Sequence, residues 1–72
     1  MMTPDSTTKR VAKRLRALRR ERDMTQVDVA EKAKMSPMYY SKIERGAVKP
    51  SVDMYERIAK ALKVTASDIF PF

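Results

Sequence analysis

The chain has 72 residues and contains neither cysteine nor histidine, and this length predicts a single domain with a small core. Without those two residue types, disulfide bonds are excluded, and we expect no metal site, no cofactor and no enzyme activity. Sixteen lysine and arginine residues against nine acidic residues give a net charge of +7. This charge favours a polyanionic partner, either nucleic acid or an anionic membrane surface, although charge that serves only solubility is the alternative interpretation.

Hydropathy argues against a membrane protein. No stretch approaches the ~20 apolar residues that span a bilayer, and the first residues lack the apolar run of a signal peptide, so we expect a cytoplasmic location. Residues 7–22, which we predict below to form a basic helix, have a narrow apolar face without tryptophan or phenylalanine. This composition also disfavours attachment to a membrane surface.

Helix start and stop signals divide the chain. Residues 1–6 include Pro4 and show no periodicity, so we expect a flexible tail before one domain over residues 7–72. The remaining signals predict five helices and no strand, hence a compact all-α domain. The predicted helices cover residues 7–22, 26–33, 37–45, 52–62 and 66–70.

The second and third predicted helices have the clearest boundaries. Thr25 and Asp28 have the spacing of a capping box. Ser36 followed by Pro37 is typical of a helix start, and Gly46 is typical of a helix end. Because so few residues separate these two helices, they must meet at a sharp angle, which is the helix-turn-helix unit.

A row of basic residues runs along the first predicted helix. Lys9, Lys13, Arg16 and Arg20 recur at helical spacing, where like charges repel by a few tenths of a kcal/mol per pair, roughly. Two interpretations remain open: a solvated face, or a face that contacts phosphates.

The order and spacing of these signals over residues 15–70 resembles the phage repressor/Cro-like (XRE-type) helix-turn-helix family, which includes the restriction–modification controller proteins. The matching stretches are Leu-Arg-Ala-Leu-Arg (15–19), Met-Thr-Gln-Val-Asp-Val-Ala (24–30), Met-Ser (35–36), Lys-Ile-Glu-Arg-Gly (42–46), Pro50 and Ile-Ala-Lys-Ala-Leu-Lys-Val (58–64). The resemblance implies a five-helix, lambda-repressor-like fold whose third helix lies in the major groove. It also implies a sequence-specific transcriptional regulator, of repressor or controller type, that binds operator half-sites as a homodimer.

The same resemblance implies roles for individual residues. The implied base contacts are Pro37, Met38, Tyr39, Ser41 and Lys42, and the implied DNA backbone contacts are Gln26, Ser36, Arg45 and Lys49. It further implies an ion pair between Arg19 and Glu44 that ties the first helix to the third.

Several residues depart from the family pattern. Lys34 and Lys63 stand where the family usually has glycine, and Asp23 stands at a third such turn. If the backbone is left-handed there, each lysine adds on the order of 1 kcal/mol of strain, whereas aspartate tolerates this conformation better. Tyr40 replaces an aliphatic core residue, so its hydroxyl must find a partner or reach solvent. None of these residues lies on the implied DNA face, so we expect costs to stability with function preserved.

The implied recognition face lacks arginine, asparagine and glutamine, the side chains that read bases most sharply. Met38 suits a thymine methyl group, and Lys42 suits guanine but discriminates less than arginine would. We therefore expect part of the specificity to come from DNA shape and half-site spacing. For Met38 and Tyr39, ordinary packing against a neighbouring helix is the alternative interpretation.

The C-terminal residues predict how two copies meet. The resemblance implies that Ile69 and Phe70 belong to the core, whereas Phe72 follows Pro71 and is harder to bury within one subunit. We expect Ile69, Phe70 and Phe72 to contribute to a dimer interface, with a disordered last residue as the alternative for Phe72. The short length leaves no room for an effector domain, so no small-molecule effector is expected. A competing function for the whole chain is an antitoxin or anti-repressor module that uses the same fold to bind a protein.

Overall fold

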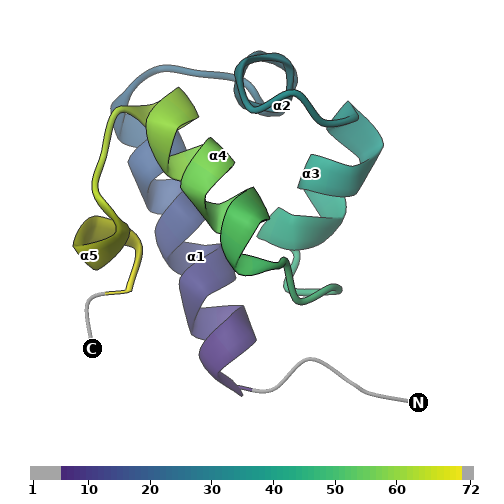
Figure 1. Ribbon diagram of the computed structural model, residues 1–72, viewed down its shortest axis with the longest axis vertical. Helices are drawn as coiled ribbons and strands as arrows, with labels where there is room; N and C mark the ends of the chain where they lie inside the picture. The colour runs from purple at the N-terminus through teal and green to yellow at the C-terminus, as the bar shows by residue number, and fades with distance from the viewer. Residues whose placement is uncertain (1–5, 71–72) are drawn as a thin grey trace.

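The computed structural model describes residues 6–70, which form five helices and no strand (Figure 1). The helices are α1 (Ser6–Glu21), α2 (Gln26–Lys32), α3 (Pro37–Glu44), α4 (Val52–Leu62) and α5 (Ala66–Ile69). The predicted all-α, five-helix fold is confirmed, and each helix starts and ends within one residue of its predicted bounds. Ser6, which we expected to lie in the tail, begins α1, and the rest of that tail lies outside the described residues.

Local hydrogen bonds explain why α2 and α3 start where they do. The Thr25 hydroxyl oxygen accepts the Asp28 N–H at 3.0 Å, and the Asp28 carboxylate accepts the Thr25 N–H at 2.9 Å. The predicted capping box is therefore present. At α3, the Ser36 hydroxyl oxygen accepts the Tyr39 N–H at 3.1 Å, and Gly46 follows the helix with a φ of 71°. These caps fix where α2 and α3 begin, and only residues 33–36 lie between the two helices.

The helices surround one core. In Figure 1, α4 is drawn in front of α1, with α3 on one side, α5 on the other and α2 across the top. Helix α2 packs against α3 and α4, and α1 packs against α3 and α5. Helix α3 thus has one side held by α1 and α2, while its other side faces outward.

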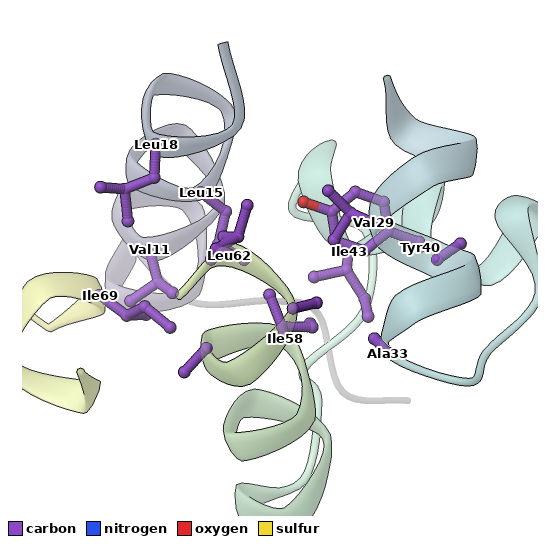
Figure 2. Close-up of a cluster of buried hydrophobic side chains, with 13 residues drawn as sticks. Val11, Leu15, Leu18, Val29, Ala33, Tyr40, Ile43, Ile58, Leu62 and Ile69 are labelled. Atoms are coloured by element: carbon purple, nitrogen blue, oxygen red, sulfur yellow. The ribbon is translucent and has the colours of Figure 1, made fainter. Parts of the chain in front are cut away.

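Side chains from all five helices meet in the core, as Figure 2 shows. The aliphatic side chains at its centre are at most 1% exposed: Val11, Leu15, Val29, Ile43, Ile58, Leu62 and Ile69. Because the side chain of Ile69 is completely buried within the subunit, the prediction that it forms part of a dimer interface is corrected. It anchors α5 to the core instead.

Tyr40 is also completely buried. No hydrogen bond of standard geometry joins its hydroxyl oxygen to another described residue, but the Glu44 carboxylate lies close enough to interact with this hydroxyl. Burial, together with the nearby Glu44 carboxylate, raises the pKa of Tyr40 well above its ordinary value. The phenol is therefore neutral and acts mainly as a bulky core residue.

The three suspected turns are all left-handed. Asp23, Lys34 and Lys63 have φ values of 53°, 59° and 58°. The expected backbone strain is therefore present at both lysines, because an L side chain disfavours this conformation.

Candidate nucleic-acid interface

The outward side of α3 carries a row of exposed or half-exposed side chains. Met38 is 72% exposed, and Lys42 and Arg45 are exposed as well, with Ser41 half-buried between them. Their spacing of three, four and seven residues places all four on one face of the helix. Tyr40, two residues after Met38, lies on the opposite, buried side of the helix. The structure thus gathers most of the predicted base contacts on one surface.

The leading end of α3 divides into packed and unpacked residues. Ser36 and Pro37 are exposed. Tyr39 is half-buried and packs against the core, so the packing interpretation applies to much of its ring. Met38 has no such neighbour to cover it and stays open to solvent. Lys49 is exposed in the loop that follows α3.

A buried carboxylate holds α3 in place. The Arg19 guanidinium donates to both oxygens of Glu44, from Nε at 2.7 Å and from Nη2 at 3.1 Å. Glu44 is completely buried, and the Arg19 side chain is 13% exposed. The ion pair implied by the resemblance is therefore present in a bidentate geometry, which is the strong form of this interaction. Arg19 Nη1 also donates to the Met24 carbonyl oxygen at 2.8 Å, which ties down the turn before α2.

The electrostatics of this pair favour its charged form. Burial by itself raises the pKa of Glu44, but hydrogen bonds from Arg19 and neighbouring groups outweigh that effect, so the pKa lies below its ordinary value. The same hydrogen bond raises the pKa of Arg19. Both groups are therefore ionised at neutral pH.

Gln26, a predicted contact to the DNA backbone, lies at the start of α2 and also makes a contact within the fold. Its side-chain Nε2 donates to Glu44 Oε1 at 3.1 Å, so part of its hydrogen-bonding capacity is used inside the fold. An amide nitrogen carries two N–H bonds, so the second remains for a ligand. Glu44 thereby orients Gln26 at the start of α2, which sequence reasoning missed because the two residues are far apart in the chain.

The basic row on α1 borders the end of α3. The Arg16 guanidinium donates to the Glu44 carbonyl oxygen. A Cβ atom built on Gly46 would lie 3.2 Å from Cγ of Lys9, so Lys9 packs beside the turn that ends α3. Because Lys9 and Lys13 share a helix face and both are exposed, the α1 row continues the basic surface of Arg45.

Residues 6–70 lack the features of two other kinds of protein. No group of three or more acidic, histidine or cysteine side chains in this part of the chain could hold a metal ion. No helix in the same range is long and apolar enough to cross a membrane.

Comparison with known proteins identifies the family. A family model described as helix-turn-helix matches residues 15–69. The chain belongs to this helix-turn-helix family. The immunity repressor protein of Bacillus phage phi105 is 44% identical over 59 residues, which cover 82% of this chain and 41% of that relative. The chain thus spans less than half the length of this helix-turn-helix relative.

Solved structures of controller proteins agree with the fold. The restriction–modification controller protein C.AhdI from Aeromonas hydrophila superposes with a TM-score of 0.89 at 24% identity, covering 92% of this chain and 100% of that one. The wild-type controller protein C.Esp1396I gives a TM-score of 0.86 at 30% identity, covering 93% and 87%. The predicted resemblance to phage repressors and controller proteins is confirmed.

Proposed function

We propose that this chain binds duplex DNA in a sequence-specific manner and regulates transcription as a repressor or controller protein. The observation that carries the proposal is the outward face of α3, where Met38, Lys42 and Arg45 stand exposed on a helix fixed from behind by Glu44. Membership in the helix-turn-helix family supports it. A related phage protein is an immunity repressor, which supports the regulatory part.

The size of α3 suits the major groove. Its eight residues make a helix of about 12 Å, and the groove is about 12 Å wide. In this position Lys42 donates to guanine O6 and N7, and Met38 contacts a thymine methyl group. Pro37, Tyr39 and Ser41 line the rest of the contact with the bases.

Backbone contacts come from residues on both sides of α3. Ser36, Arg45 and Lys49 contact phosphates near its two ends, and Gln26 contacts a phosphate with its free N–H beside the first amides of α2. The basic row of α1, starting at Lys9, adds phosphate contacts beyond the end of α3. Since few side chains read bases strongly, DNA shape and half-site spacing supply further specificity.

A homodimer places two copies of α3 on neighbouring half-sites, one helical turn or ~34 Å apart. An apolar hollow of about 260 Å³ lies between α4 and α5, with Val52, 75% exposed, at its edge. The rings of Tyr55 and Phe70 line it in an edge-to-face contact, with centroids 5.0 Å apart. We propose that a second copy covers this hollow, with Phe70 at the seam; the predicted contribution of Phe72 lies outside the described residues.

The alternative function, an antitoxin or anti-repressor that binds only a protein, accounts less well for the α3 surface. A module that binds only a protein has little need for Lys42, Arg45 and Lys49 around one exposed helix. The proposal includes no cofactor and no small-molecule effector.

Binding of a labelled duplex, measured over a range of salt concentrations, tests the DNA interface. If each subunit neutralises roughly three to five phosphates, a dimer gives a log–log slope of roughly −5 to −9. Lys49→Gln should make this slope less steep by about 1, and Lys42→Ala should relax the preference at one base position. Lys63→Gln, a matched loss of charge just after α4, should leave both unchanged. A slope near zero would refute the electrostatic part of the proposal.

Sedimentation equilibrium tests the dimer. Val52→Glu places a charge at the edge of the apolar hollow and should shift the protein to monomer. Val27→Glu is the matched control, because Val27 is also exposed, at 47%, but lies on α2. An unchanged dimer in the Val52 variant would place the interface elsewhere.

A further inference from the structure

A second basic surface lies where the C-terminal end of α2 meets the last turns of α4. It contains two hollows, of about 310 and 290 Å³, and Lys32 lines both of them. All charged residues that line these hollows are basic, and together they form what we call the α2–α4 basic face: Arg22, Lys32, Lys34, Arg57, Lys60 and Lys63. None of these residues belongs to the proposed DNA interface.

One member of the face has a structural role. Arg57 Nε donates to the Ala33 carbonyl oxygen at 2.8 Å, and its Nη2 donates to the Lys34 carbonyl oxygen. These bonds fasten the end of α2 to α4 and so fix the shape of the face. Arg57 therefore holds the surface together, and its charge is partly used by the two carbonyl groups.

The lysines of the face keep their charge available. Lys32, Lys34, Lys60 and Lys63 are all exposed. None of them has a carboxylate within 4.0 Å among the described residues. Their positive charges thus face solvent around hollows whose lining carries no acidic side chain.

Two of these lysines stand at strained positions. Lys34 and Lys63 have φ values of 59° and 58°, a conformation that glycine adopts without strain. Strained backbone is enriched at functional sites, where a side chain is retained despite its cost to stability. A solvated surface gains nothing from lysine at a left-handed turn, yet both strained lysines border the same face. This coincidence points to a ligand that uses their charge.

The floor of the hollows identifies the chemistry of that ligand. Between the basic side chains lie apolar groups of Met24, Ala33, Ala61 and Leu62. A DNA duplex offers evenly spaced phosphates on a convex rod and no apolar group that would fill such hollows. In a peptide that alternates carboxylates with apolar side chains, the carboxylates pair with the basic side chains at the rim and the apolar side chains pack on the floor.

We propose that the α2–α4 basic face binds an acidic segment of a protein partner, in which carboxylates alternate with apolar side chains. The segment lies across both hollows, with carboxylates on Lys32, Lys34, Lys60 and Lys63. Because the face is separate from α3, the partner and DNA bind at the same time.

Two pairs of substitutions that remove equal charge test the proposal. The probe is a short fluorescein-labelled peptide of alternating glutamate and leucine, and its affinity is compared with that of duplex DNA. Lys32→Gln with Lys63→Gln should weaken peptide binding about fivefold, the loss of two exposed ion pairs, and should leave DNA affinity within about twofold. Lys42→Gln with Lys49→Gln, on the α3 side, should weaken DNA binding and leave peptide affinity within about twofold.

A glycine pair separates binding from folding. Lys34→Gly with Lys63→Gly removes strain, so it should raise the Tm while weakening peptide binding about fivefold. Equal loss of peptide affinity in the two glutamine pairs would overturn the proposal by showing a general attraction between opposite charges. Loss of DNA affinity in the Lys32 and Lys63 pair would overturn the proposal by assigning the face to DNA. Failure of the wild-type protein to bind the peptide would overturn it as well.

Discussion

Glu44 links α3 to α1 and α2 through its hydrogen bonds to Arg19 and Gln26, and Glu44→Gln is the change that tests this link. The substitution keeps the shape of the side chain and removes its charge. It leaves the Arg19 guanidinium, now without a carboxylate, in a site where only 13% of its side chain is exposed. We expect a large loss of stability, because a charge left unpaired in a buried site is costly.

The structure sets the size of this loss. Breaking a buried ion pair by removing one partner costs about 3–5 kcal/mol. Arg19 is slightly solvated and keeps its bond to the Met24 carbonyl oxygen, so we expect a loss of about 2–3 kcal/mol, at or just below the lower limit of that range. A domain of 72 residues has a total stability of roughly 4–11 kcal/mol. At about 4–8 °C per kcal/mol for a domain of this size, the Tm should fall by roughly 10–20 °C.

The pH dependence gives a second, independent readout. The pKa of Glu44 is lowered in the folded state, so its contribution to stability is present above the unfolded pKa of about 4.3. That contribution is lost as the pH falls through the lower, folded pKa. The difference in unfolding free energy between wild type and Glu44→Gln should therefore be largest near neutral pH and shrink in acid.

Urea unfolding at a fixed protein concentration, repeated at several pH values, measures both effects. Glu21→Gln is the matched control, because Glu21 is exposed and its carboxylate lies 3.8 Å from the Arg22 guanidinium in a surface pair, which is worth about 1 kcal/mol or less. If Glu44→Gln cost no more than this control, or if its cost did not depend on pH, the ion pair would not be what holds α3.

Three further substitutions test other parts of the structure. Lys34→Gly and Lys63→Gly should each stabilise the fold by on the order of 1 kcal/mol through relief of left-handed strain, and a lower Tm in thermal unfolding would contradict this. Tyr40→Phe removes a buried hydroxyl that has no hydrogen bond of standard geometry, so it should raise the unfolding free energy by about 1 kcal/mol. A lower unfolding free energy would mean that the hydroxyl donates a hydrogen bond to Glu44. Met38→Ala should leave the unfolding free energy within about 0.5 kcal/mol, because Met38 is 72% exposed, and weaken binding to DNA that carries thymine at the contacted position.

The helices were predictable because their signals are local. Thr25, Asp28 and Ser36 bond to backbone or side-chain groups three residues away, so the sequence pattern contains the interaction itself. The left-handed turns at Lys34 and Lys63 were predictable by resemblance, from the positions where relatives have glycine.

The contacts that build the site were harder to predict because they join distant parts of the chain. Gln26 and Glu44 are 18 residues apart, and Arg57 reaches carbonyl groups 23 and 24 residues away. No local pattern marks such pairs, and only the resemblance pointed to the pair of Arg19 and Glu44. For Ile69, the resemblance indicates the core and the place near the C-terminus indicates an interface; the side chain packs into the core.

Selection from a random duplex pool at ~150 mM salt, where non-specific phosphate contacts are weakened, tests the central claim most directly. The account predicts enrichment of an inverted repeat whose half-sites lie about ten base pairs apart. It also predicts that Lys42→Ala loses the preference at one position in each half-site while the rest of the motif persists. A pool with no enriched motif, or a motif unchanged by Lys42→Ala and Met38→Ala, would contradict the claim that the outward face of α3 reads DNA.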